Sequence, residues 1–249
     1  ALRGIRLHRG FDEPAAEIAL VARAEPRLLR RVRHLHEARE CRRAVVVAEV
    51  DHDVRDRDTD RLGDSGPEAI GLLSLMLHCE ARRSARRDGN SRYVPLDEQD
   101  TATWNAIMIA EADALLRKAG SFNRFGPFQC QAAIQSVHAA RRLSGKTDWQ
   151  ALTTLYAALV MMKPTLGAHV SQAAVIGRAL NAAAGLKRLD QLDPRAVASY
   201  QPYWAVRAFL LSQAGDDTAA AGAYMTAIGL SDSPAVLDFL AGRLKEARL

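Results

Sequence analysis

The 249-residue sequence is short of cysteine and aromatic residues. Its three cysteines, Cys41, Cys79 and Cys130, have no short spacing between any pair, which excludes a disulfide framework and a CxxC metal or redox motif. Aromatic residues make up 6% while alanine and leucine are abundant, which disfavours a β-sandwich or barrel. No stretch approaches the roughly 18 apolar residues of a membrane span, and the start lacks a signal-peptide core. We therefore expect an all-α protein of the cytoplasm, with no membrane contact.

Motifs that carry chemistry are also missing. The sequence has no G-x4-GK[ST], no G-x-G-x-x-G and no HExxH. His34 and His36, near Cys41, are two residues apart and would point to different faces of a helix, so they do not predict a metal site. Cys130 and His138 lie on one predicted helix, where a lone histidine is usually a hydrogen-bonded core residue. We expect no catalytic residue, no metal and no cofactor, because a hydrolase would need a nucleophile–base pair that the sequence does not offer.

One tetrapeptide resembles part of a protease site. Residues 63–66 read Gly-Asp-Ser-Gly, the sequence around the nucleophile of chymotrypsin-like proteases, with Ser65 in the place of that nucleophile. That chemistry needs a β-barrel, an oriented histidine and a buried aspartate. Here the tetrapeptide stands between a charged segment and a helical pattern, so no protease is predicted.

The charge balance is mildly basic, with 34 basic and 29 acidic residues and a formal net charge of +5. Binding to DNA needs several cations on one face. Only one stretch concentrates them, and it contains Arg82, Arg83, Arg86, Arg87 and Arg92. A solvated helix end is the simpler interpretation, and a contact with phosphate or an acidic protein is the alternative. Any DNA binding through this stretch is expected to be weak and sensitive to salt.

The chain divides near residue 65. Residues 1–65 are rich in arginine and aspartate, and the alternating charges of 51–61 leave almost no apolar face, so residues 50–65 are expected to be a linker or disordered. Before them, 12–24 and 26–44 have the composition of weakly specified helices. Residues 66–249 show recurring helix starts and stops with apolar residues at helical spacing, which predicts a helical domain.

The start and stop signals give the expected helices. They cover about 67–89, 98–118, 128–143, 148–163, 169–184, 194–213, 216–229 and 234–247, of which the last four are expected to pair into hairpins. Asp148 is a suitable N-cap, and Gly120 and Pro164 are suitable stops. The second helix is expected to bury Trp104, Ile107, Met108, Ala112 and Leu115.

Internal repetition is the most informative pattern. The tetratricopeptide repeat (TPR) reads W-x2-L-G-x2-Y in one helix and A-x3-F-x2-A in the next, because small residues let two antiparallel helices touch. Residues 204–227 match it with Trp204, Ala208, Leu211, Gly215, Ala220, Tyr224 and Ala227. A degenerate copy opens at Trp149, Leu152 and Tyr156. We therefore expect TPR-like hairpins stacked in a solenoid, a fold whose surface normally binds a partner.

Several short motifs, which we call boxes, occur in the same order as in a known protein family. They are the Leu-rich helix ending in Ala81-Arg82-Arg83, the box Asp97-Glu98-Gln99-Asp100 before Trp104, the run Gly126-Pro127-Phe128-Gln129-Cys130-Gln131-Ala132-Ala133-Ile134 with His138-Ala139, and Asp148-Trp149. On these boxes, residues 71–249 resemble the C-terminal extension, of DUF6596 type, of extracytoplasmic-function RNA polymerase sigma factors with a TPR-like tail.

The resemblance implies a protein-interaction module that acts in transcription initiation. Its implied partners are RNA polymerase and the core regions of the sigma factor, and promoter DNA would be contacted only through sigma regions that we do not find in residues 1–65. The family's F-N-E-G-Y segment is absent as well. Three interpretations stay open: a tail preceded by unrelated sequence, a divergent relative, or a segment read in a shifted frame. Searching the encoding DNA for F-N-E-G-Y in another frame tests the third.

The residues expected to contact a partner lie in or beside these boxes. They are Arg82, Arg83, Asp97, Gln99, Asp100, Trp104, Gln129, Gln131 and His138. Structural roles are the alternative: the acidic box can cap a helix start, Trp104 can belong to the core, and glutamines two apart cannot share one helix face. The alternative function is a stand-alone TPR-type scaffold without a role in transcription.

Overall fold

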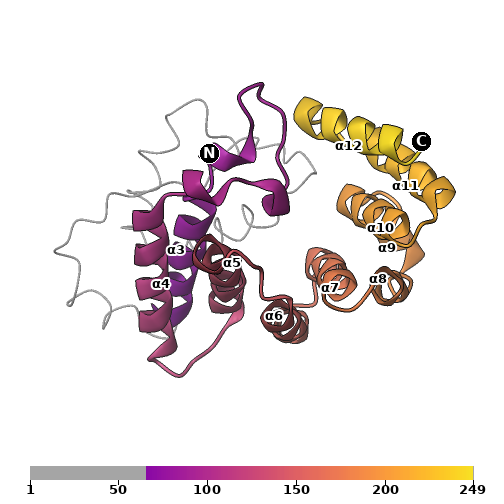
Figure 1. Ribbon diagram of the computed structural model, residues 1–249. Helices are drawn as coiled ribbons and strands as arrows, with labels where there is room; N and C mark the ends of the chain where they lie inside the picture. Colours follow the sequence, from indigo (N-terminus) through magenta and orange to yellow (C-terminus); the bar gives the residue numbers. More distant parts are fainter. Residues whose placement is uncertain (1–65, 249) are drawn as a thin grey trace, which may run out of the picture. The chain divides into compact units, whose positions relative to one another are not determined.

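The computed structural model describes residues 66–248 (Figure 1). All regular secondary structure in this range is helical, apart from an isolated β-bridge between Arg87 and Tyr93. The expected all-α fold is therefore confirmed for this part of the chain. The expectations for helices 12–24 and 26–44, for the linker, for His34, His36 and Cys41, and for Ser65 lie outside the described residues.

From α4 onward, the helices follow one another with short connections. The helices are α3 (Gly66–Glu80), α4 (Ala106–Gly120), α5 (Pro127–Ser144), α6 (Trp149–Met162), α7 (Leu166–Ala179), α8 (Ala182–Leu189), α9 (Pro194–Val197), α10 (Gln201–Gln213), α11 (Asp217–Gly229) and α12 (Pro234–Glu246). Helix α3 packs against both α4 and α5, and the later helices pack mainly against their neighbours in the chain. Most of the fold is therefore built from contacts that are local in sequence.

Side-chain caps explain where several helices begin. Asp148 accepts a hydrogen bond from the amide of Ala151, which confirms it as the N-cap of α6. Asn105 caps α4 in the same way, through the amides of Ile107 and Met108. Each cap satisfies amides that have no partner inside their own helix. The expected stops are also in place, because α4 ends at Gly120 and Pro164 follows the end of α6.

The segment between α3 and α4 differs from the prediction. Helix α3 ends at Glu80 rather than near residue 89, and α4 begins at Ala106 rather than near 98. We call residues 81–105 the connector. It contains three short 3-10 helices, η3 (Ser84–Arg86), η4 (Leu96–Glu98) and η5 (Thr101–Thr103), and its two ends are tied by a hydrogen bond from the Asn105 amide to the Ala81 carbonyl, 2.8 Å long.

Two further expected helices are wrong in extent. The predicted helix 169–184 ends at Ala179, because Asn181 accepts a hydrogen bond from the Ala184 amide and starts α8. The predicted helix 194–213 is broken into α9 and α10. Pro202 lies in the first turn of α10, where backbone N–H groups have no partner inside the helix, so its missing N–H costs nothing. In the middle of a helix, a proline would remove one hydrogen bond.

Helices α3 and α5 approach closely and are joined by a buried polar contact. A Cβ atom on Gly71 would lie 2.8 Å from the backbone nitrogen of Gln129, so only glycine fits there. One turn earlier, the Glu68 carboxylate accepts hydrogen bonds from the amides of Phe128 and Gln129, at 2.9 and 3.2 Å. A carboxylate stabilises the free amides and the positive end of a helix, so Glu68 fixes the start of α5 against α3.

The α10–α11 hairpin has the residue pattern that the TPR comparison predicts. Ala208, Ala220 and Ala227 are fully buried, and Tyr224 packs with them in one core cluster. Gly215 sits in the turn with a φ of 80°, a left-handed conformation that favours glycine. The small residues therefore lie where α10 and α11 touch, as the repeat requires. A continuous solenoid through all the hairpins stays a prediction.

Candidate docking site

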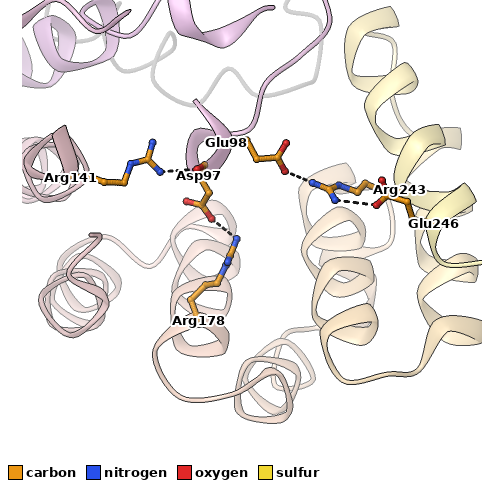
Figure 2. Close-up of polar contacts among 6 residues, drawn as sticks. All are labelled: Asp97, Glu98, Arg141, Arg178, Arg243 and Glu246. Carbon is orange, nitrogen blue, oxygen red and sulfur yellow. Dashed lines mark hydrogen bonds and ion pairs between the residues drawn. The ribbon is translucent and has the colours of Figure 1, made fainter. Parts of the chain in front are cut away.

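The connector lies against three arginines from three different helices. Arg141 belongs to α5, Arg178 to α7 and Arg243 to α12, and we call them the arginine row. Figure 2 shows that all three point toward η4, where Asp97 and Glu98 stand side by side. Here segments far apart in the sequence meet through charged side chains.

Arg141 holds the backbone of the connector. Its guanidinium donates hydrogen bonds to the carbonyl oxygens of Asp97 at 2.9 Å, Leu96 at 2.8 Å and Gln99 at 3.1 Å. These carbonyls belong to the tight turn around η4. One arginine with a planar, forked donor group can satisfy several of them at once. Arg141 therefore fixes the turn that presents the two acidic side chains.

Arg178 is held between aromatic rings and pairs with Asp97. Its guanidinium carbon lies 5.5 Å from the centroid of Trp149 on α6 and 4.7 Å from the centroid of Phe209 on α10. The same guanidinium forms an ion pair with the Asp97 carboxylate. Stacking on two rings restricts the arginine side chain, so its charge is already oriented toward the connector.

Arg243 makes the corresponding contact on α12. It pairs with Glu98 and also with Glu246 on its own helix, and its guanidinium lies 5.2 Å from the centroid of Phe239. The ring of Tyr93 meets Phe239 edge-on, with centroids 5.5 Å apart. The connector therefore contacts α12 through one aromatic pair and one ion pair.

Trp104 anchors the end of the connector. Only 3% of its surface is exposed, and its ring lies between the guanidiniums of Arg82 and Arg141, at 5.8 and 5.2 Å from the ring centroid. Arginine over tryptophan is the most favourable cation–π pairing for a protein side chain. Trp104 is thus a core residue, as its structural alternative predicts, although it lies in the connector and not in α4.

The acidic box divides into two roles. Asp100 accepts a hydrogen bond from the Ala102 amide and caps η5, which confirms the capping interpretation for this residue. Asp97 and Glu98 instead pair with arginines of α7 and α12. Gln99 is buried and its Nε2 donates to the Val94 carbonyl at 3.2 Å, within the connector. Two of the four residues therefore make long-range contacts that helix capping does not explain.

The expected contact residues on α5 lie inside the described fold. Gln129 has no exposed surface, and its Nε2 donates to the Arg124 carbonyl at 2.6 Å and to Glu68 at 3.2 Å. Gln131 is half-buried and donates to the Pro127 carbonyl at 3.3 Å. His138 is 9% exposed and meets Trp149 edge-on. We expected Gln129 and His138 to contact a partner. Their side chains are instead buried and contribute to the packing of α5.

The arginine-rich stretch has partners within the chain. Arg82 is buried and donates to Gln135 on α5. The others pair locally: Arg83 with Glu80, Arg86 with the carbonyl of Cys79, Arg87 with the carbonyl of Ser91, and Arg92 with Asp88. Since these cations hold the end of α3 and the start of the connector, the stretch supports the helix-end interpretation over a phosphate-binding face.

The buried thiol and histidine of α5 lack the chemistry of a catalytic pair. The Cys130 thiol donates to the Leu155 carbonyl at 3.3 Å, and burial raises its pKa to about 11, which disfavours the nucleophilic thiolate. Burial, together with a smaller contribution from the nearby Arg82, lowers the pKa of His138 to about 4. Neither shift prepares its group for acid–base work near neutral pH.

A second group of polar residues joins α3, α4 and α5, and the sequence did not indicate it. The Nε2 atom of His78 lies 3.3 Å from Asp113 Oδ1, and the Ser136 hydroxyl donates to the same oxygen at 2.6 Å. The Ser136 hydroxyl therefore donates its hydrogen bond to the aspartate. In a serine hydrolase, the nucleophilic serine donates to the histidine, which acts as its base. Burial lowers the pKa of His78 to about 4, so the ring is neutral at pH 7.

Two absences hold for residues 66–248. No three histidine, cysteine, aspartate or glutamate side chains gather there in a way that could hold a metal ion. Within the same range, no helix combines the length and the apolar character needed to cross a membrane.

Sequence reasoning missed the arginine row. Arg141, Arg178 and Arg243 lie far apart in the sequence, and no short motif unites them. The available signal was local: Arg178 follows the small and apolar run Ala173–Gly177, and Arg243 follows Phe239 by one turn. An arginine at such a place often covers an aromatic ring, which both residues do.

Comparison with known proteins gives a partial family assignment. Residues 55–120, which include α3, the connector and α4, match DUF6596, described as a family of unknown function. An uncharacterised protein of Rhizobium meliloti (strain 1021) is 35% identical over 171 residues, which cover 69% of this chain. The aligned part spans 40% of that relative's length. No solved structure matches. The DUF6596 part of the expected resemblance is confirmed, and the fold defines an all-α protein built from helical hairpins.

Proposed function

We propose that this chain is the protein-interaction module of an alternative RNA polymerase sigma factor. It acts in transcription initiation by docking to the polymerase, to the sigma core regions or to a regulator, and it transforms no substrate. In this role the module controls whether the sigma factor engages its promoter. DNA contacts belong to other regions of such a factor.

One observation carries the proposal: boxes that are separate in the sequence meet in one set of contacts. Asp97 of the acidic box, Trp104 and the α5 helix of the Gly126-Pro127 run are joined through Arg141. Glu68 of α3 fixes the start of that same helix. The resemblance to sigma-factor tails therefore involves residues that determine how the helices pack, and the DUF6596 match over 55–120 supports it.

The site chemistry supports docking over catalysis. The described residues bring together guanidiniums and aromatic rings, which are the groups enriched at protein–protein interfaces and their binding hot spots. The Cys130 thiol and the Ser136 hydroxyl donate hydrogen bonds to a carbonyl and to a carboxylate, and neither donates to a histidine. A module that binds without turnover agrees with both facts.

Affinity capture from the native cell extract tests the proposal. The chain is immobilised with and without residues 1–65, and bound proteins are identified by mass spectrometry. We expect RNA polymerase subunits or a sigma factor to be retained by both forms at moderate salt and to be absent from a control column carrying an unrelated helical-repeat protein. Retention of neither by either form would contradict the proposal.

The alternative is a stand-alone TPR-type scaffold without a role in transcription. The α10–α11 hairpin favours it, because its buried alanines and Tyr224 fit the general TPR pattern and require no sigma factor. The same capture experiment distinguishes the two functions. Reproducible recovery of partners that exclude the transcription machinery would favour the scaffold.

A further inference from the structure

The arginine row has the chemistry of a site that binds carboxylates. Two of its members, Arg178 and Arg243, are stacked on aromatic rings and form ion pairs with carboxylates, while Arg141 donates to backbone carbonyls. The three residues come from α5, α7 and α12, so the site is made by the fold and by no single helix. Oriented guanidiniums recognise carboxylates and carbonyl oxygens with directional hydrogen bonds.

The connector fills this site in the manner of a ligand. Asp97 and Glu98 are adjacent in sequence, yet they pair with arginines on two different helices. The backbone carbonyls of the residues on either side, Leu96 and Gln99, accept hydrogen bonds from Arg141. A ligand that replaced them would need two adjacent carboxylates on a short turn with free carbonyl groups, which is the chemistry of an acidic peptide.

We propose that the arginine row binds an acidic peptide segment of a partner protein, and that Asp97 and Glu98 occupy the site until the partner replaces them. The proposal rests on the protein-docking role proposed above and adds to it the surface and the chemistry of the partner. It does not depend on which protein supplies the segment.

The ion pairs of Asp97 and Glu98 with the arginine row are weak enough for exchange. Glu98 and Arg243 remain half-exposed, and ion pairs at exposed positions contribute only about 0–1 kcal/mol each. Two buried polar atoms of the connector, Trp104 Nε1 and Gln99 Oε1, have no hydrogen-bond partner among the described residues. Such unpaired groups disfavour the packed state. The connector therefore occupies the site largely because it is part of the same chain. This covalent attachment raises its effective concentration at the site.

Nucleic acid fits the site less well. A phosphate backbone is bound by a run of cations along one face. Here Glu246 already pairs with Arg243, and Asp100 lies in the same acidic box as the two paired carboxylates. A peptide presents its carboxylates at separate points between which carbonyls and apolar groups can contact Arg141 and Phe239.

A peptide-binding measurement on the full chain tests the proposal. The probe is a fluorescent peptide with the sequence of residues 93–104, and the matched control peptide carries Asn and Gln at the positions of Asp97 and Glu98. Fluorescence anisotropy at low salt gives the dissociation constant for the wild-type chain and for the D97N/E98Q chain. Circular dichroism shows that each variant is folded. Adding Tyr93→Ala to the double variant loosens the connector further.

We expect the D97N/E98Q chain to bind the acidic peptide at least tenfold more tightly than the wild-type chain does, and the affinity to fall as salt rises. Adding R178Q and R243Q should abolish that gain. Three results would overturn the proposal: no binding to either released variant, equal binding of the neutral peptide, or tighter binding of a single-stranded oligonucleotide. Because the assay contains no polymerase, its outcome is independent of the capture experiment.

Discussion

The guanidinium of Arg141 lies over the ring of Trp104, 5.2 Å from its centroid, and this pair joins α5 to the connector. Arg82, near the end of α3, lies on the same ring at 5.8 Å. The Trp104 ring therefore links α5 to both ends of the connector, the segment that carries the acidic box. The stability of the connector should depend on this ring more than on the exposed ion pairs.

Trp104→Ala should lower the free energy of unfolding by about 3–5 kcal/mol, because it removes a large buried ring and leaves a cavity between two arginines. Urea denaturation followed by circular dichroism measures the change. Ile107→Ala is the matched control: Ile107 is 81% exposed although the sequence pattern predicted it to be buried, and its loss should change stability by less than about 0.5 kcal/mol. Equal effects of the two substitutions would contradict the placement of Trp104.

Gly71→Ala should destabilise the protein by about 1–3 kcal/mol, because the added Cβ would meet the backbone of α5 at Gln129. Gly222→Ala in α11 provides the comparison. Nothing lies within 4 Å of a Cβ at that position, so alanine there should stabilise the helix by about 0.5–1 kcal/mol. Thermal or urea unfolding of the two variants should therefore give shifts of opposite sign, and two shifts of the same sign would refute the close approach of α3 and α5.

Acid should destabilise the fold between pH 6.5 and about 4. Burial lowers the pKa of both His78 and His138 to about 4, whereas in the unfolded chain each has a pKa near 6.5. Between these values the unfolded state binds more protons, so the free energy of unfolding decreases as the pH falls through this window and is independent of these two groups above it. At 1.36 kcal/mol per pKa unit, each histidine contributes up to about 3 kcal/mol.

Urea titrations at pH 7, 6, 5 and 4 measure this dependence. The His138→Gln variant should show a smaller loss of stability over the same window, because one of the two titrating groups is gone. A wild-type curve that is flat between pH 6.5 and 4 would disprove the neutral, buried state of both rings.

Cys130 should resist alkylation in the native state. Its thiol is fully buried and has a pKa of about 11, so almost no thiolate is present at neutral pH. Iodoacetamide labelling at pH 7.5, followed by peptide mass spectrometry, should leave Cys130 unmodified in buffer and modify it in 8 M urea, about the concentration at which most domains are unfolded. Native labelling at the rate of a free cysteine peptide would show that α5 does not bury this residue.

Local signals predicted much of the fold. The starts of α6 and α12 and the ends of α4 and α11 are close to the expected positions, because caps, prolines and glycines act on the residues next to them. In the α10–α11 hairpin, the buried alanines and Tyr224 were predictable, since their spacing is a packing requirement. The break before Gln201 was missed although Pro202 marks it, because the apolar spacing continues across the break.

The candidate site was predictable only in part. Asp100 caps a short helix, which is a local event, and the acidic box was recognised as one possible capping group. Asp97 and Arg178 are 81 positions apart, and no local pattern can indicate that pairing. Residues 98–105 of the connector were predicted as the start of a helix, because acidic residues favour a helix N-terminus, whereas the actual structure of η4 depends on Arg141 from a later element.

The contact between Glu98 and Arg243 has a consequence for the order of events on the ribosome. The two residues are 145 positions apart, and the chain is made from its N-terminus. Helices α3, α4 and α5 are complete long before Arg243 emerges, so the carboxylate of Glu98 lacks this partner until 145 further residues have been added. Closure of the connector onto α12 is then a late step, and nascent chains are the form in which its acidic side is most accessible.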